Sequence, residues 1–534
     1  MKKVLILTSL IVAALSLQAK VITPERAMKV AAAVADRNTA GMVQNQQRQD
    51  MKVAYTAMTA DKADFYVINK NQGFVIVSAD DVIGETVLGY SDKGQFDYDN
   101  MSDNAKWWLS QYQEQIEYLR QHGGQAVMNK TPKGSVFASV VVPPLLGDNH
   151  WHQSEPYNNM CPLLPGSTTG RCVVGCGATS VAQVMWFHKW PLKGSGTHSY
   201  SWNGKTLTAR FSNSVYDWQN MLPAYVNDYT DTEASAVALL SRDVGYSIDM
   251  DYGESSGSYG YMKANALKSY FKYSSTVSHK SRSGMSTSSW DALIKNELNN
   301  FRPIPYEGHG SDGGHAFVID GYAENDYFHF NFGWGGSDDG YYLSAVAGEF
   351  PSSQSMNLNV FPADHANRIE VDGIFYNRLS STDVQVTYPD ETSQYAGDLV
   401  IPSTVTIDTV TYVVSQIGNV AFANCNLLTS VTLPETLTSI GGNSFWGCAD
   451  MSIIVPWTTP LPVTYSTFDV DACSSITLVV PEGTVQDYST AEGWRLFNNI
   501  TDGSENINEW GEWEPFETGS VTFTYNVLFS TVLS

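Results

Sequence analysis

The sequence is poor in charged side chains, and in basic ones above all. Of its 534 residues 16% are charged, with 31 Lys and Arg against 55 Asp and Glu, for a formal net charge of −24. A chain this acidic is repelled by the phosphate backbone, which argues against nucleic-acid binding. Hydrophobic residues make up 43%, enough to build folded cores rather than disorder.

Long hydrophobic runs are also scarce. The run Val4–Leu17 follows two lysines and leads to Ala19, and it is too short to span a bilayer. A charged start, a short apolar middle and a small-residue exit are typical of a secretory signal. We expect residues 1–19 to be cleaved off, no transmembrane segment, and a secreted protein, extracellular or at the cell surface.

Cysteine is infrequent, with six residues in two groups: Cys161, Cys172 and Cys176, then Cys425, Cys448 and Cys473. A zinc site needs two close ligand pairs, and no second pair matches the spacing of Cys172 and Cys176. We therefore expect no metal and no cofactor. In an exported protein Cys161 could pair with Cys172, and the sequence leaves their state open.

The remaining chain divides into three units and a tail that we leave unassigned. The units are residues 20–135, 136–362 and 363–505, and the tail is 506–534. Helices and strands mix in the first two units, which predicts an α+β fold class, whereas the third is β-rich.

Periodicity predicts the main elements of the first two units. Helical spacing covers Pro24–Asp36, Asn104–His122 and Gly175–Trp190. β-rich pieces around a polar turn predict a hairpin over residues 65–78, and a second strand pair is expected over residues 316–332.

An internal repeat marks the third unit. Ile417–Cys425 is echoed by Ile440–Cys448 with a period of 23 residues, and Phe468 continues the period. One short strand per repeat of this length is typical of a leucine-rich-repeat solenoid, of which about three repeats are visible. We expect strands near residues 431–434, 453–456 and 478–481, and repeat cysteines that serve as small buried hydrophobes.

Cys176 is the first candidate for chemistry. It lies in a run of small residues that opens the third predicted helix. A helix N-terminus stabilises a thiolate through its free N–H groups and its dipole, and the thiolate is the nucleophilic form. On this segment alone, a structural cysteine fits equally well.

Three further segments match the partners that such a nucleophile needs. His315, behind two glycines and 139 residues after Cys176, falls within the roughly 130–150 spacing of papain-like enzymes. Asn331, which precedes a glycine-rich turn containing Trp334, could orient the imidazole. Gln153 could donate to an oxyanion together with the Cys176 amide. Taken singly, His315 also fits a histidine of the core, Asn331 a packed glycine-rich turn, and Gln153 a polar surface turn.

Residues 145–345 resemble the streptopain (C10) family of papain-clan cysteine peptidases. The matching stretches are residues 151–158, 176–185, 250–258, 314–321 and 331–336. One departure is Phe332, where the family usually carries Trp. We expect its ring to pack beside His315 but to lack the indole donor.

This resemblance implies a papain-like two-lobed catalytic domain with Cys176 and His315 as the catalytic pair. Gln153 and the Cys176 amide would form the oxyanion hole, and Ser258 and Gly314 would contact the substrate. It also implies hydrolysis of proteins or peptides with a hydrophobic residue two positions before the scissile bond.

The flanking units carry resemblances of their own. Residues 64–68, 73–81 and 87–91 resemble the family's inhibitory propeptide, so the chain's own N-terminal unit is an expected partner. The repeats resemble BspA-type leucine-rich repeats of bacterial surface and secreted proteins, so a host or surface protein is a candidate ligand.

Two other functions stay open at this stage. The repeats could make the chain an adhesin with a degenerate peptidase domain, although Cys, His, Gln and Asn all stand at their expected positions. The same site could also serve another acyl transfer, such as transamidation. Release of free peptide termini from a protein substrate separates hydrolysis from transamidation.

Overall fold

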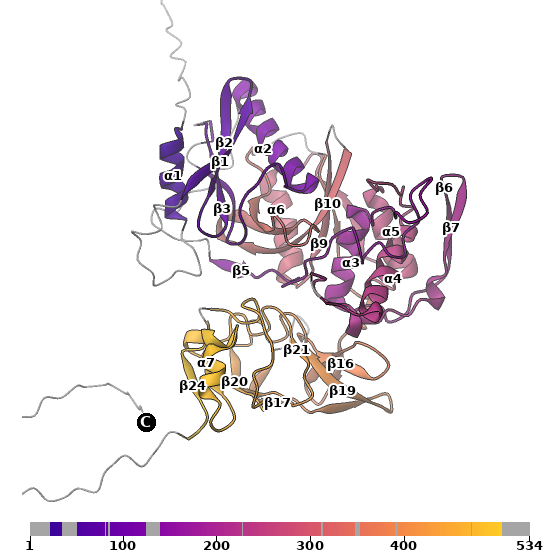
Figure 1. Cartoon of the computed structure of the whole chain (residues 1–534), viewed down its shortest axis with the longest axis vertical. Coiled ribbons are helices and arrows are strands. Elements are labelled where there is room, and N and C mark those ends of the chain that lie inside the picture. Colours follow the sequence, from indigo (N-terminus) through magenta and orange to yellow (C-terminus); the bar gives the residue numbers. More distant parts are fainter. Residues whose placement is uncertain are drawn as a thin grey trace, which may run out of the picture.

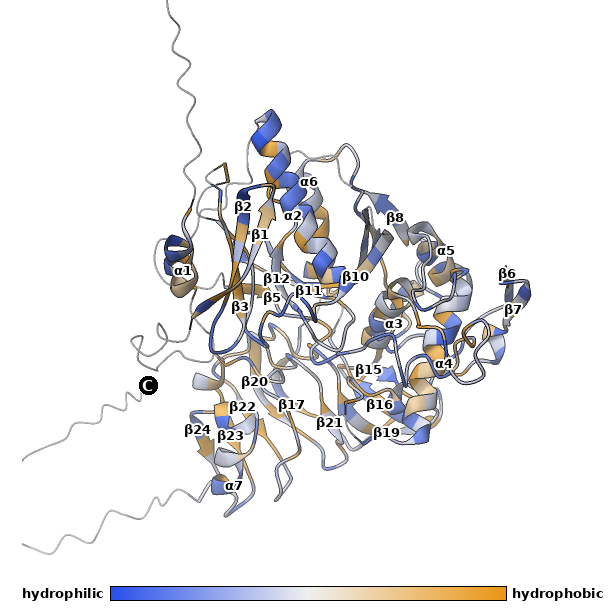
Figure 2. Ribbon diagram, turned by 45° about the horizontal axis from the view of Figure 1, so that its top comes forward, coloured by the Kyte–Doolittle hydropathy of each residue, from blue (hydrophilic) through white to orange (hydrophobic). Residues whose placement is uncertain are grey.

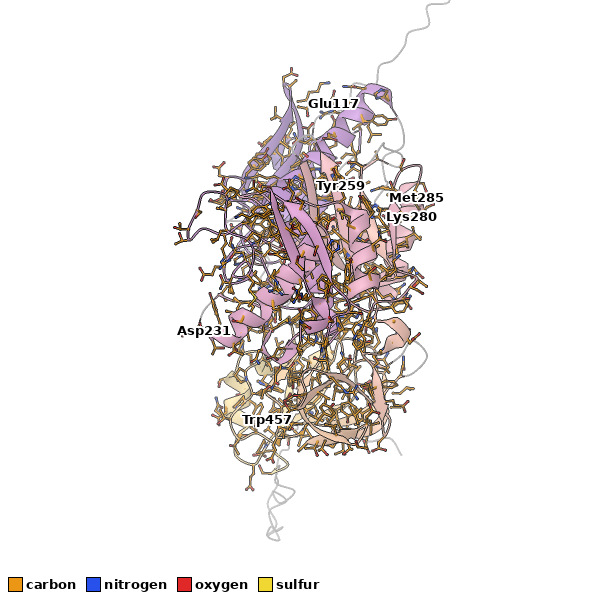
Figure 3. All side chains as sticks on the ribbon, turned by 90° about the vertical axis from the view of Figure 1, so that its right-hand side faces the viewer. Glu117, Asp231, Tyr259, Lys280, Met285 and Trp457 are labelled. Atoms are coloured by element: carbon orange, nitrogen blue, oxygen red, sulfur yellow. The ribbon has the colours of Figure 1, made fainter. Side chains whose placement is uncertain are left out.

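The first two units lie side by side and share one sheet, and the repeats form one end of the molecule (Figure 1). The computed structural model describes residues 22–34, 51–80, 82–83, 86–123, 139–226, 228–310, 313–347, 353–389, 394–470 and 472–504. Glu117 of the first unit lies near one end and Trp457 of the repeats near the other (Figures 1 and 3). The expected signal, residues 1–19, and the tail, residues 506–534, lie outside the described residues.

An antiparallel sheet with two helices forms the N-terminal unit. Its elements are α1 (Pro24–Ala33), β1 (Lys52–Thr59), β2 (Lys62–Asn69), β3 (Phe74–Ser78), β4 (Val87–Ser91) and α2 (Asp103–His122). The side chains of Thr23 and Ser102 accept hydrogen bonds from the first turns of α1 and α2. Both polar and apolar residues lie along α2 in Figure 2, as expected of a helix with one buried face. The two predicted helices and the hairpin are confirmed.

This sheet continues directly into the second unit. The strand order is β1-β2-β3-β4-β12-β11-β10-β9-β13-β8, and β5 also pairs with β10. The added strands are β5 (Val140–Val142), β8 (Ser278–Ser281), β9 (Ile304–Gly310), β10 (Gly313–Ala323), β11 (Tyr327–Asn331), β12 (Gly340–Leu343) and β13 (Ser355–Leu358). At the junction Tyr341 pairs with Tyr90 and Tyr342 with Gly89. The predicted pair over residues 316–332 is confirmed as β10 and β11.

Helices make up the other half of the second unit, with α3 buried in its centre. They are α3 (Cys176–His188), α4 (Asp231–Ser247) and α5 (Gly260–Tyr270), accompanied by the hairpin β6 (His198–Trp202) and β7 (Lys205–Ala209), whereas α6 (Thr287–Asn299) packs on the sheet against β9 and β10. Residues 177–188 of α3 are all buried, and this helix packs against β9 and β10 on the sheet side and against α4 on the other. Helix α3 therefore lies at the junction between the sheet and the other helices (Figure 1). No helix of the described part combines the length and apolar character needed to cross a membrane.

The third unit is a solenoid with its own hydrophobic core. Five parallel strands stack in it: β17 (Ala396–Val400), β20 (Leu427–Thr432), β22 (Ser452–Ile454), β23 (Thr477–Val479) and β24 (Asn499–Thr501). A second sheet joins β14 (Ile369–Val371), β15 (Ile374–Arg378), β16 (Asp383–Val386), β18 (Thr404–Ile407), β19 (Val410–Ile417) and β21 (Ser439–Ile440), and the short helix α7 (Val485–Thr490) lies near β24. The three predicted strands are confirmed, and β17 and β24 add two rungs that the 23-residue motif does not reveal.

Aromatic rings form a ladder through the solenoid. Phe445 stacks on Phe422 and on Phe468, with ring centroids 5.0 Å and 6.0 Å apart. The repeat cysteines are buried in the same core and are free thiols, as expected. The ladder explains the period, because each rung must place a ring above the last.

We expect Phe445→Ala to lower the free energy of unfolding of the repeats by about 3–5 kcal/mol, because it empties the middle of the ladder. Urea denaturation followed by circular dichroism measures this change. The matched control is Leu427→Ala, since Leu427 is 63% exposed on the same solenoid. Equal destabilisation by both changes would contradict the role given to the ladder.

Candidate active site

Cys176 is the first residue of α3, as the sequence predicts. Gly175 precedes it with φ of 90°, and a side chain there would meet the sulfur of Met250 at 2.7 Å. The thiol is half-buried, at a helix end whose N–H groups favour negative charge. In this state burial raises the pKa of the Cys176 thiol, and the nearby Lys263 ammonium opposes that rise in part. Cys176 therefore lies at the predicted helix start, where burial favours its neutral thiol.

His315 lies on β10, with its ring covered by the N-terminal unit. Asn104 Oδ1 of α2 is 3.2 Å from His315 Nδ1, a hydrogen-bond distance. The Trp107 ring stacks on the imidazole with centroids 5.7 Å apart and planes inclined by 26°. Trp107 also covers Gly308, the cross-strand partner of His315, where an added Cβ would meet the indole at 2.2 Å.

The Asn104 side chain is held on both sides. Its Nδ2 donates to the carbonyl of Ala316 at 2.8 Å and to that of Phe332 at 2.9 Å. Asn104 thus joins the strand that carries His315 to the loop that follows β11. Asn104 Oδ1 lies at hydrogen-bond distance from Nδ1 of the imidazole. It therefore occupies the place where a supporting asparagine would accept a hydrogen bond from the imidazole.

Asn331, expected to orient His315, is engaged elsewhere in this state. Its Oδ1 accepts from Gln183 Nε2 at 2.8 Å and from the Gly333 amide at 3.1 Å, while its Nδ2 donates to the Asn149 carbonyl at 2.8 Å. Gln183 Nε2 also lies 3.0 Å from Asn149 Oδ1. These bonds fix the loop behind the site, and the contact at His315 Nδ1 comes from Asn104 instead.

Gln153, the expected oxyanion donor, belongs to a segment that is bonded to the turn before Cys176. Gln153 is buried, and its carbonyl accepts from the amide of Val174 at 3.0 Å, which ties its segment to the turn before Cys176. The ring of Phe332 packs against Phe317, Phe330 and Tyr342. The Trp107 ring stacks on His315.

The two residues expected to contact substrate flank Cys176 and His315. The buried Ser258 Oγ has no hydrogen-bond partner among the described residues and would lie 2.8 Å from a Cβ added at Gly177. Gly314 is exposed beside His315, and Trp334 is exposed in the loop after β11. An unsatisfied hydroxyl at this place is available to a ligand.

Sequence reasoning missed a buried ion pair next to the nucleophile. Lys263 Nζ lies 2.7 Å from Glu307 Oε2, and Ser355 Oγ donates to the other carboxylate oxygen at 2.9 Å. Lys263 also borders Gly177 in the first turn of α3. It missed Asn104 and Trp107 as well, because the pattern of α2 indicates an amphipathic helix and nothing about its target.

The site combines a cysteine at a helix start with a histidine on a strand, and a helix of the N-terminal unit covers that histidine. This is the arrangement of a papain-like cysteine peptidase in its precursor form. Residues 151–342 match the Peptidase C10 family, residues 19–116 the Spi protease inhibitor, and residues 402–491 the BspA type leucine rich repeat region in six copies. Streptopain from Streptococcus pyogenes is 38% identical over 332 residues, which cover 56% of this chain and 81% of that protein. The chain belongs to the peptidase C10 family.

Two further relatives agree with this assignment. The thiol protease/hemagglutinin PrtT of Porphyromonas gingivalis is 30% identical over 340 residues, covering 59% of this chain and 39% of that protein. A prointerpain A fragment from Prevotella intermedia superposes with a TM-score of 0.50 at 31% identity, covering 58% of this chain and 98% of the fragment. The chain is therefore a cysteine peptidase with an N-terminal inhibitory unit.

We expect Asn104→Ala to shorten the half-time of precursor activation roughly tenfold. The change frees His315 and leaves two carbonyls unpaired, at a cost of about 1–3 kcal/mol to the inhibited state. Intact mass spectrometry of the purified precursor over time gives the half-time. The matched control is Asn100→Ala, an exposed asparagine just before the same helix. Unchanged activation of the Asn104 variant would show that this contact does not restrain the enzyme.

Proposed function

We propose that the chain is the zymogen of a secreted cysteine endopeptidase that cleaves protein substrates by Cys–His acyl transfer. The observation that carries this proposal is the placement of Cys176 at the start of a buried helix opposite β10, whose His315 is held by Asn104 of the N-terminal unit. An inhibitory contact on that histidine is useful to the cell only if the histidine is needed for chemistry.

In the proposed mechanism the N-terminal unit first leaves the site. The Cys176 thiol gives its proton to His315, and the thiolate attacks the scissile carbonyl. The Gln153 amide and the Cys176 N–H stabilise the oxyanion. The imidazolium then protonates the leaving amine, and the thioester remains. Water, deprotonated by His315, hydrolyses the thioester and restores the thiol.

Supporting roles follow the same geometry. With Asn104 gone, we propose that Asn331 accepts from the imidazole and fixes its tautomer. Trp334 would support the site, and Ser258 and Gly314 would contact the substrate. We propose that the space over Gly308, which Trp107 occupies in the precursor, accepts the hydrophobic side chain two positions before the cut.

We further propose the order of processing and the place of action. Residues 1–19 would direct secretion, residues 20–135 would be removed as the propeptide, and residues 136–362 and 363–505 would remain as the catalytic and repeat domains. A host or surface protein is the proposed external ligand of the repeats.

We expect Cys176→Ala to abolish casein cleavage and any self-processing near residues 130–140. Casein hydrolysis and the intact mass of the chain are the measurements. Cys172→Ala serves as the control, because Cys172 is a buried free thiol four residues away. If the Cys176 variant still cleaved casein, the nucleophile would be another residue.

A further inference from the structure

A short segment of the catalytic unit receives a row of hydrogen bonds from the repeats. We call residues 144–148 the docking segment. Asn419 Nδ2 donates to the carbonyl of Leu145 at 3.0 Å, and Asn443 Nδ2 to that of Pro144 at 3.1 Å. Ser466 Oγ donates to the carboxylate of Asp148 at 2.6 Å, and Thr464 Oγ1 donates to the same oxygen.

These donors come from one edge of the solenoid. Asn419, Asn443 and Ser466 stand 24 and 23 residues apart, close to the repeat length, so successive rungs each contribute one. Between them the backbones touch, since a Cβ added at Gly442 would meet the Cα atom of Gly147 at 2.9 Å. The edge is complementary to the docking segment in both shape and hydrogen bonding.

Apolar contacts extend the interface. Val420 and Ala423, although on the repeats, are buried within the hydrophobic core of the first two units. The Tyr388 ring packs against Phe187 of α3 and against Phe301, with centroids 6.1 Å and 5.3 Å apart. Such contacts are those of a fixed domain rather than of a freely tethered one.

The other side of the docking segment faces the catalytic strand. The Leu145 amide donates to the Asp320 carbonyl at 2.8 Å, and the Leu146 amide to the Asp320 side chain at 3.0 Å. Asp320 lies on β10, the strand that carries His315. The segment is therefore clamped between the repeats and the catalytic strand.

From the docking segment the chain leads straight into the site. Asn149 follows it and binds both Asn331 and Gln183. The carbonyl of Trp151 then accepts from the Gly335 amide at 3.1 Å, and Gln153 comes two residues later. A shift of the docking segment would move both the Asn331 loop and the proposed oxyanion donor.

The N-terminal unit also contacts the loop that follows Asn331, but only until activation removes that unit. Ser102 donates its amide to Asp338 at 3.1 Å, and Ser91 donates its hydroxyl to the Asp339 carbonyl at 2.8 Å. Both bonds are lost when that unit leaves, whereas those of the repeats stay. We propose that the repeat domain, through Asn419 and Asn443, holds the docking segment and so positions Asn331 and Gln153 in the mature peptidase.

This inference rests on the proposed peptidase activity, and its partner surface is the chain's own catalytic unit. The test compares the activated full chain with its Asn419→Ala, Asn443→Ala double variant, on a peptide substrate. We expect kcat to fall roughly tenfold, because a small misplacement of catalytic groups slows the reaction by about this factor. KM should stay nearly unchanged. Hydrogen exchange at residues 144–153 should also accelerate in the variant.

The control is Thr429→Ala, which removes a bond to Asp398 within the solenoid and far from the docking segment in sequence. It should leave kcat and the exchange of residues 144–153 unchanged. A double variant with wild-type kcat and wild-type exchange would overturn the positioning role. An inactive wild-type chain would overturn the proposed peptidase activity instead.

Discussion

The Nδ1 atom of His315 meets Asn104, a residue from a different unit of the chain, and much of the architecture serves to hold that partner in place. Helix α2 is anchored on the strands of both units: the Tyr112 hydroxyl lies 2.9 Å from the Leu88 carbonyl of β4 and 2.8 Å from the Leu343 carbonyl of β12. Gln115 Oε1 accepts from two successive amides, those of Val346 and Ala347. The pairing of β4 with β12 adds backbone bonds to these side-chain anchors. The inhibitor is therefore part of the same folded body as the enzyme.

Such a junction also explains how one event can activate the site. Asn104 and Trp107 leave His315 together, because both lie on α2. In the precursor burial raises the pKa of the Cys176 thiol. An imidazole released from Asn104 and Trp107 can form an ion pair with the cysteine, which favours the thiolate. Lys263, next to the first turn of α3, remains as a fixed positive charge.

The sequence predicts the parts of the fold and site whose signals are local. Small residues before an apolar periodic run make Cys176 a candidate, and two glycines before an apolar strand do the same for His315. Asn104 could not be found in this way, because its partner lies 211 residues further on and a polar residue near a helix start normally faces water. For the same reason the place of Asn331 in the precursor was not predictable, since the group at His315 Nδ1 comes from another unit.

Strands β17 and β24 were not predicted, because their rungs lack the phenylalanine and cysteine of the repeat motif. The repeat edge likewise carries no signal of its own, since Asn419 and Asn443 resemble ordinary turn residues until Pro144 and Leu145 are brought against them.

We propose that one cysteine becomes reactive when the N-terminal unit is released. Labelling of the precursor and of the activated wild-type chain with a thiol-reactive peptidyl epoxide, followed by intact mass and peptide mapping, tests this proposal. We predict one adduct on Cys176 after release and very little on the intact precursor, with the five other, buried cysteines unmodified in both. Equal labelling of the precursor, or no adduct on Cys176 after release, would contradict the claim.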